Sequence, residues 1–389
     1  RDQPRSRGLG DVYKRQKLVP AVMAMGMLFL SGCTLSVYNS YRDIENLDVV
    51  QVIGLDAVDG GGVRFSVATG PDSSGREPVR LTQDSPSLDG AMRSMEQLSG
   101  PGSLFYSGTG AIVMGEKAAD DAERWLDAVA RSKELRLDTE LYVLKHGQAE
   151  ELIAGDDAPE DVFADLSSLA KLVREDGPSP VPTCADVSRA LLSSGSSLAT
   201  AIELTEGADG KLTPVTSGYA ILTGSGLAGW LSEEEALGAG LFMGGPGISV
   251  VELEDGITAE LAGADVALDA RWGKDGGIEG IDVSAEVKGS VIEAPAGSSL
   301  GSEEAWAELE QELAGCVYGW VSGVLEKSQT LNADFLNLEH RIESAHPLKY
   351  ANMPVQWSET FRDIDISVSV QAKIVNMREY SVSPYEGES

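Results

Sequence analysis

Residues 224–229 read GSGLAG and match the pattern G-x-G-x-x-G, whose glycines bind the phosphates of a dinucleotide in some proteins. That chemistry needs a helix that begins within the motif, so that its N-terminus faces the phosphates. Here the motif continues into Trp230 and Leu231, and the capping pattern that begins a helix, Ser232 to Glu235, comes only afterwards. We therefore predict that these glycines form the turn of a β-hairpin and that the chain binds no cofactor.

Histidine and acidic side chains offer a second kind of chemistry. His340 and Glu343 are three positions apart, a spacing that can hold a metal ion on one helix face. The pair stands among other charged residues at the end of a long predicted helix, and we interpret it as a solvated helix end. The sequence also lacks a serine elbow, a phosphate-binding loop and a catalytic-cysteine context. We predict no metal site and no enzyme activity.

Cys33 is the residue whose chemistry the sequence specifies best. Residues 14–33 read KRQKLVPAVMAMGMLFLSGC, a short basic stretch followed by an apolar run too short to span a membrane comfortably. This is the layout of a secretion signal. The last four residues, LSGC, resemble the bacterial lipobox, in which the cysteine thiol receives a diacylglycerol and becomes the mature N-terminus. We predict a signal peptide at residues 1–32, of which about the first 16 are foreign to the native protein, and lipidation at Cys33.

The other two cysteines, Cys184 and Cys316, lie far apart in the sequence. They either pair outside the cell or serve as small buried side chains, and we favour the second interpretation. Charge is more informative, because 30 Lys+Arg against 62 Asp+Glu give a net charge of -32. Such a surface repels nucleic acid and anionic lipid headgroups, so nucleic-acid binding is excluded as a function.

The apolar pattern predicts strands and helices in mixed order, without the regular alternation of a Rossmann fold. Apolar runs flank a turn at residues 59–62, and residues 86–100 have helical spacing with Leu88, Met92, Met95 and Leu98 on one face. Further strands and helices follow in no regular order. The best fold class is α+β, with mixed or antiparallel sheets packed by helices.

Later segments give the remaining expectations. The acidic, proline-bearing stretch at residues 155–182 predicts a loop or linker, and residues 187–204 predict a helix. A long amphipathic helix begins with Ser302 as its N-cap. Residues 248–272 and 278–293 alternate as strands of an antiparallel sheet, and residues 363–377 form a last strand. We expect domains at residues 33–200, 201–247 and 248–380.

The order of several segments resembles one known family. They include YRDIENLDVVQVIGLD at residues 41–56, RSKELRLDTELYVLKHGQAEELI at 131–153, EKSQTLNADFLNL at 326–338 and WSETFRDIDISVSVQAKI at 357–374. Each segment alone is a weak signal, whereas their order and spacing together are specific. The chain is similar to the Ger(x)C lipoproteins, the C subunit of bacterial spore nutrient germinant receptors, over nearly all of the sequence after Cys33.

This resemblance implies a non-catalytic α+β ectodomain that acts in spore germination. It implies a lipid anchor on the outer face of the inner spore membrane, and assembly with two membrane-spanning partners, the germinant receptor A and B subunits. Exposed candidates for partner contact are Trp230, Trp320, Trp357 and Phe361, although for each of them we favour half-buried packing over a contact hot spot. The alternative class is a lipid-anchored solute-binding protein of a transporter, which predicts two α/β lobes around a ligand cleft.

Overall fold

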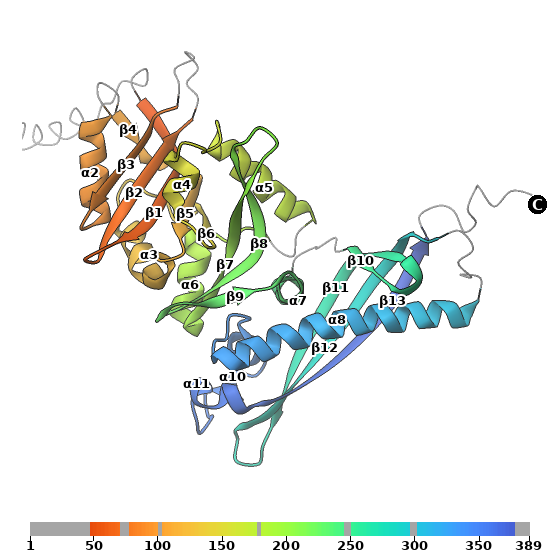
Figure 1. The fold of residues 1–389 in the computed structure, drawn as a ribbon. Helices are drawn as coiled ribbons and strands as arrows, with labels where there is room; N and C mark the ends of the chain where they lie inside the picture. Colours follow the sequence, from red (N-terminus) through yellow and green to blue (C-terminus); the bar gives the residue numbers. More distant parts are fainter. Residues whose placement is uncertain are drawn as a thin grey trace, which may run out of the picture. The chain divides into compact units, whose positions relative to one another are not determined.

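The protein is represented by a computed structural model (Figure 1). It describes residues 47–70, 78–99, 103–176, 180–244, 250–295 and 302–377. The predicted signal peptide and Cys33 lie outside these residues. Within them, the strands form two mixed sheets, one of nine strands and one of four.

The nine-stranded sheet begins with the predicted hairpin. Strands β1 (Leu47–Val58) and β2 (Gly62–Thr69) pair antiparallel. The turn between them needs left-handed backbone at Gly60 (φ 85°) and Gly61 (φ 80°), which glycine adopts without steric cost. This hairpin confirms the prediction from the sequence.

The remaining strands of this sheet are β3 (Arg80–Ser85), β4 (Ser103–Phe105), β5 (Ala111–Gly115), β6 (Glu140–Leu144), β7 (Ser196–Glu206), β8 (Leu212–Thr223) and β9 (Gly226–Leu231). The order is β3-β2-β1-β5-β6-β7-β8-β9, with β4 paired to β1. The pairs β1–β5, β5–β6 and β6–β7 are parallel, so both faces need a cover of helices.

Alternate residues along the central strands enter two separate cores. Ile112 and Met114 of β5 join the core under helices α2 (Leu88–Leu98), α3 (Ala122–Arg131) and α6 (Cys184–Ser194). Ala111 and Val113 join the core under α4 (Ala149–Ala154) and α5 (Val162–Asp176). This alternation is the period of two expected when a strand is buried on both faces.

Three expectations from the sequence are wrong here. The stretch predicted as a loop at residues 155–182 contains α5, which buries Val162, Leu166 and Val173. The segment predicted as a helix at residues 187–204 is a helix only as far as Ser194 and then becomes β7, because Gly195 ends α6 in the left-handed conformation (φ 71°). Leu98 ends α2 with 52% of its surface exposed and does not join the buried face.

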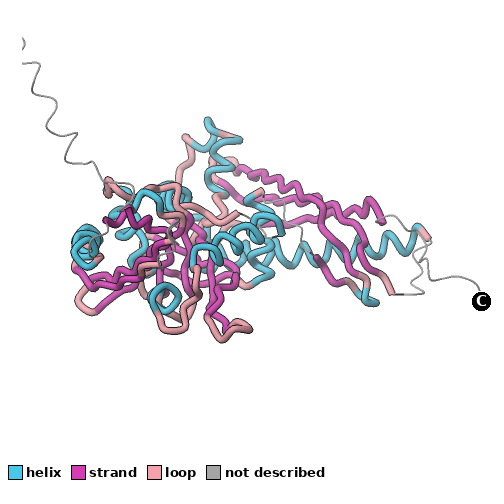
Figure 2. Tube along the Cα trace, turned by 90° about the horizontal axis from the view of Figure 1, so that it is seen from above, coloured by secondary structure: helices cyan, strands magenta, loops and turns pink. Residues whose placement is uncertain are grey.

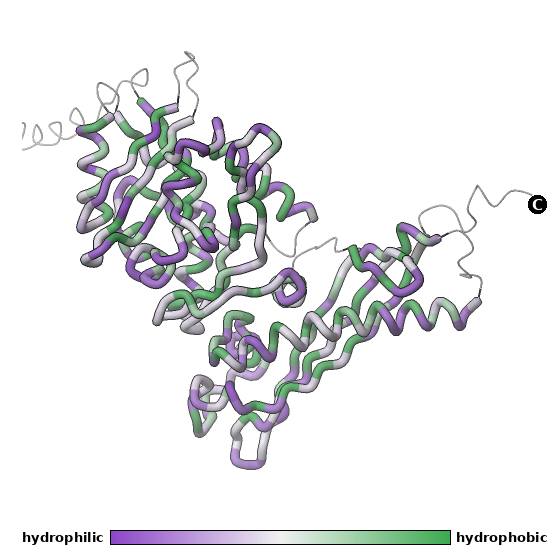
Figure 3. Tube along the Cα trace, viewed as in Figure 1, coloured by the Kyte–Doolittle hydropathy of each residue, from purple (hydrophilic) through white to green (hydrophobic). Residues whose placement is uncertain are grey.

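The second sheet has the order β10-β11-β12-β13. Its strands are β10 (Val250–Glu252), β11 (Thr258–Trp272), β12 (Ile278–Glu293) and β13 (Asp365–Met377). The first three pair antiparallel as predicted, and β13 adds to β12 in parallel. Figure 3 shows the alternating hydropathy along these strands, whose apolar side chains face one side of the sheet.

Helix α8 (Glu303–Leu331) lies along this sheet in both views (Figures 1 and 2). Leu313, Val317, Val321 and Val324 repeat at helical spacing and are fully buried. The Ser302 hydroxyl accepts the N–H of Ala305, which confirms the predicted N-cap. The other helices in this part are α7 (Glu233–Met243), α9 (Leu338–Ala345), α10 (Pro347–Tyr350) and α11 (Trp357–Thr360). Short 3₁₀ turns are η4 (Tyr106–Gly108), η5 (Ala119–Asp121), η6 (Glu254–Gly256) and η7 (Phe361–Asp363).

This architecture confirms the α+β class and differs from the two α/β lobes that the solute-binding alternative predicts. The proposed division at residues 200 and 247 stays a prediction, although β8 and β9 continue the sheet to which β7 belongs. Within the ranges that the structure describes, no helix has both the length and the apolar character needed to cross a membrane.

Candidate functional site

The lipidation site predicted at Cys33 lies outside the described residues, so it stays a prediction. The glycine motif lies in the β8–β9 hairpin as predicted: residues 224–225 form the turn and residues 226–229 belong to β9. Ser232 then caps α7 through the N–H of Glu235. A helix therefore starts after β9 and not within the motif. His340 and Glu343 lie on α9 with exposed side chains, as expected of a solvated helix end.

Cys184 and Cys316 do not form a disulfide. Cys184 is fully buried, and burial raises the pKa of its thiol to about 12. Cys316 is half-buried, and burial also raises its pKa. Both thiols are therefore poor nucleophiles at neutral pH, in agreement with the interpretation as small packing side chains. Among the described residues, no group of three or more His, Cys, Asp or Glu side chains is arranged to hold a metal ion.

Trp230 and Trp320 are half-buried, as a partner-contact residue can be. Trp230 lies on β9, which ends the sheet among the described strands, and the Lys145 ammonium lies 5.9 Å from its ring centroid. Lys145 also pairs with Glu203 at 2.8 Å, and this hydrogen-bonded ion pair lowers the pKa of that carboxyl. The Trp230 indole therefore lies at one edge of the sheet, next to the Lys145 ammonium that the ion pair with Glu203 holds in place.

Trp357 and Phe361 were expected to be exposed, and that expectation is wrong. Their exposed fractions are 4% and 1%, and their rings stack with centroids 5.1 Å apart. They are four positions apart across α11 and η7, so both rings point into the core of the second sheet. Their role as partner contacts stays a prediction that this burial disfavours.

Beside the Trp357 indole lies a buried acid, Asp334, that the sequence did not indicate. Asp334 is 3% exposed and accepts the N–H groups of Leu338 and Glu339, both at 2.8 Å, which caps α9. Burial raises the pKa of Asp334 to about 7, against the opposing effect of these two hydrogen bonds. The Trp357 indole N–H faces this carboxylate and also lowers its pKa, although it forms no hydrogen bond of normal geometry.

A second buried acid, Asp56, ends the apolar part of β1. It is 2% exposed and accepts the N–H groups of Ala149 at 2.7 Å and Glu150 at 2.9 Å, the first residues of α4. Gly115 makes room for it, since a Cβ there would lie 2.0 Å from Asp56 Oδ1. Burial raises the pKa of Asp56 to about 6, while the nearby Arg64 guanidinium lowers it. Asp56 and Asp334 lie in two of the segments that resemble the Ger(x)C family, at residues 41–56 and 326–338. This resemblance was the one signal in the sequence that could have pointed to them.

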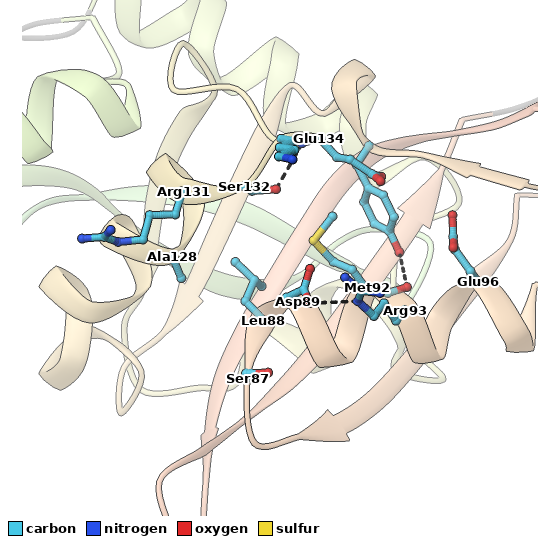
Figure 4. Close-up of a pocket in the computed structure, with 12 residues that line it drawn as sticks. Ser87, Leu88, Asp89, Met92, Arg93, Glu96, Ala128, Arg131, Ser132 and Glu134 are labelled. Carbon is cyan, nitrogen blue, oxygen red and sulfur yellow. Dashed lines mark hydrogen bonds and ion pairs between the residues drawn. The ribbon is translucent and has the colours of Figure 1, made fainter. Parts of the chain in front are cut away.

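An open groove between α2 and α3 is a concave surface with mixed chemistry (Figure 4). Its volume is about 570 Å³. Leu88, Met92 and Ala128 contribute apolar surface, and the Tyr106 hydroxyl donates to the Met92 carbonyl oxygen at 3.4 Å. The rim carries both signs of charge, on Asp89, Arg93, Glu96, Arg131, Lys133 and Glu134. An apolar floor with a charged rim has the composition of a surface that binds another molecule.

Comparisons with known proteins assign this arrangement to a class. The fold matches a solved structure titled "Crystal Structure of the GerBC protein", with a TM-score of 0.53 and 19% sequence identity, over 83% of this chain and 97% of that one. Two mixed sheets with helices in two domains are thus the fold of a GerBC-like protein. Among curated protein sequences, none matches the chain significantly.

The sequence families agree with the fold. Residues 40–204 match the family described as "Spore germination protein N-terminal domain", and residues 217–378 match "Spore germination B3/ GerAC like, C-terminal". The chain belongs to the GerAC-like family of spore germination proteins. This confirms the resemblance found in the sequence.

Proposed function

We propose that this chain is a non-catalytic, lipid-anchored subunit of a spore nutrient germinant receptor. In this proposal it acts at the outer face of the inner spore membrane. It assembles there with two membrane-spanning partners, the receptor A and B subunits, and contributes to the response to small nutrients. Candidate contact surfaces for these partners are the Trp230 edge of the first sheet and the groove between α2 and α3.

One observation carries the proposal. Both germination-protein regions occur in order on this one chain, from residue 40 to residue 378, and the first begins seven positions after the predicted lipid site at Cys33. A segment this short holds the folded part close to the membrane surface. The location beside membrane-embedded partners therefore follows from the anchor.

Because the chain is strongly negative, membrane binding has to come from the lipid anchor and not from electrostatic attraction. A net charge of -32 opposes contact with anionic lipid headgroups, so electrostatics gives no help to membrane binding. Acyl chains contribute about 0.8 kcal/mol for each buried methylene, and two or three chains give stable attachment. Membrane association should therefore depend on one atom, the Cys33 sulfur, and should resist a high-salt wash.

The test replaces Cys33 by alanine in the native gene. We expect the Cys33→Ala protein to be folded, to leave the membrane fraction, and to give spores that fail to respond to a rich nutrient mixture. Cys316→Ala is the matched control, because it removes a half-buried thiol and should leave the protein on the membrane with a normal response. If the Cys33→Ala protein stays with salt-washed membranes, the anchor is wrong. If it leaves the membrane and germination is unchanged, the receptor role is wrong.

A further inference from the structure

A second cavity, separate from the groove of Figure 4, lies over the β7–β8 strand pair. Its volume is about 430 Å³. One wall is the apolar face of α5, where Leu169 and Val173 are each 8% exposed and Leu172 is 58% exposed. The opposite wall is the first two turns of α7, with Ala236 and its neighbours. The cavity is thus mostly apolar and open on one side.

The floor of the cavity contains a hydroxyl group with no partner. Thr200 on β7 lines the cavity and is 2% exposed, and its Oγ1 forms no hydrogen bond. A buried hydroxyl without a partner costs about 1–3 kcal/mol, so proteins rarely keep one without a reason. Thr200 lines the cavity, but its Oγ1 atom is itself almost covered, so a ligand would reach the hydroxyl after a small rearrangement of the side chains at the floor.

The backbone at this floor is also irregular. Between the pairs Thr200–Tyr219 and Ile202–Thr216, β8 contains one residue more than β7, which makes a β-bulge. Gly218 in the bulge has φ 75°, and a Cβ there would lie 2.5 Å from the Leu231 carbonyl oxygen. A side chain larger than hydrogen is therefore excluded, and the bulge opens the sheet where the cavity lies.

The charge at the cavity selects the kind of ligand. Glu233, at the start of α7, is the charged residue that lines it, and no basic side chain does so among the described residues. The neighbouring Glu235 is already paired with Lys327 at 3.2 Å. We infer that this cavity binds a small organic cation, an amine with an apolar body. Its body would contact Leu169, Val173 and Ala236, and its polar part would lie between Thr200 and Glu233.

This site does not depend on the receptor role, because its argument uses neither the lipid nor the partner subunits. The test can therefore use the full chain with Cys33→Ala, and its failure would leave the proposed function untouched. The probes are 2-phenylethylammonium, the neutral 2-phenylethanol and the anionic phenylacetate, which share one apolar body. Saturation-transfer NMR and titration would measure their binding. We expect the amine to bind with a dissociation constant on the order of millimolar, as suits a ligand of this size.

Variants then locate the site. Glu233→Gln should weaken amine binding by about fivefold and leave 2-phenylethanol unchanged, whereas Glu234→Gln, on the same turn but outside the lining, should change neither. Leu172→Arg places a cation at an exposed wall, where folding tolerates it, and should abolish amine binding. Thr200→Val should weaken amine binding while raising the melting temperature of the empty protein by a few degrees, because the hydroxyl without a partner is gone.

Three results would overturn the inference. Equal binding of the amine and the alcohol would show that the cavity recognises only the apolar body of the ligand and not its positive charge. Amine binding that survives Leu172→Arg would place the ligand elsewhere on this acidic chain. Absence of saturable binding by all three probes would show that the cavity is not a small-molecule site.

Discussion

Asp56, in the first sheet, and Asp334, in the core of the second, have the same structural role, which is to cap a helix. Each is a buried carboxylate that accepts two N–H groups at the start of a short helix, at 2.7 and 2.9 Å for Asp56 and at 2.8 Å twice for Asp334. Their surroundings differ. Asp56 lies beside Arg64, whose guanidinium pairs with Asp84 and Glu150 at 2.8 and 2.9 Å. Asp334 lies beside the Trp357 indole, whose ring stacks with that of Phe361.

The difference appears in the pKa values. Burial is the largest cause of the rise in both, and it gives about 6 for Asp56 and about 7 for Asp334. In both, the two backbone N–H groups offset part of the burial, and a neighbouring glutamate, Glu150 or Glu339, raises the pKa by repulsion. Asp56 has in addition the smaller attraction of Arg64, and Asp334 that of the Trp357 indole N–H. The two carboxyl groups thus make equal numbers of capping hydrogen bonds but differ in pKa. Variants can separate the effect of the capping bonds on stability from the effect of the charge.

The largest effect is expected from Asp334→Ala. It leaves the N–H groups of Leu338 and Glu339 without acceptors beneath a packed core, which should cost about 3 kcal/mol of unfolding free energy. Urea denaturation measures the loss, and hydrogen exchange at these two amides locates it. Asp334→Asn keeps one acceptor and the volume, so it should lose roughly half as much. Equal losses for the two variants would show that the charge, and not the cap, is what α9 needs.

Asp56→Ala should cost less, about 2 kcal/mol, because α4 is shorter than α9 and fewer residues depend on its first turn. The expected signature is faster hydrogen exchange at Ala149 and Glu150, with α9 unchanged. If Asp56→Ala destabilised the protein more than Asp334→Ala, the ranking by helix length would be wrong.

The pH dependence should distinguish the two acids. An unfolded aspartate releases its proton near 3.8, and the folded groups release theirs near 6 and 7. Between these pH values the folded protein binds more protons than the unfolded chain. The free energy of unfolding therefore falls as the pH rises from the unfolded pKa to the folded pKa of each acid. Relative to its Asn variant, the wild type should lose up to about 4 kcal/mol for Asp334 between pH 4 and 7, and up to about 3 kcal/mol for Asp56 between pH 4 and 6. A flat difference across these windows would contradict both raised pKa values.

The smallest effect is expected from Arg64→Gln. The ion pairs with Asp84 and Glu150 are partly exposed, so their loss should cost less than about 1 kcal/mol. The pKa of Asp56 should rise further, because the guanidinium that lowers it is gone, and carbon-detected NMR titration measures that shift. Arg93→Gln is the control, since it removes an exposed pair on α2, at Asp89, and should leave Asp56 unchanged.

Local patterns were enough to predict the hairpin at residues 47–69, the glycine turn before α7 and the long helix α8. In each case the signal lies within a few residues, as with Ser302 and the N–H of Ala305. Helix α5 was missed because its acids and prolines were interpreted as a linker. Asp161 in fact accepts the N–H of Ala164 at the helix start, and the prolines stand outside the helix.

The two buried acids could not be predicted from local pattern. Asp56 caps a helix that begins 93 positions later in the chain, so its burial depends on tertiary structure. Trp357 and Phe361 were misplaced for a similar reason, because the same i, i+4 spacing suits an exposed pair and a buried one. Their burial is set by tertiary packing, which includes α8 and strands β11 and β12, all of them more than 20 positions earlier in the chain.

The most direct test of the central proposal is to purify the wild-type chain, with a C-terminal tag, from detergent-solubilised spore membranes and to identify what accompanies it. A receptor subunit should retain two multi-spanning membrane proteins in constant ratio, one of them permease-like, and the Cys33→Ala chain should retain neither. Recovery of the chain alone, or together with the ATPase components of a transporter, would contradict the receptor assignment.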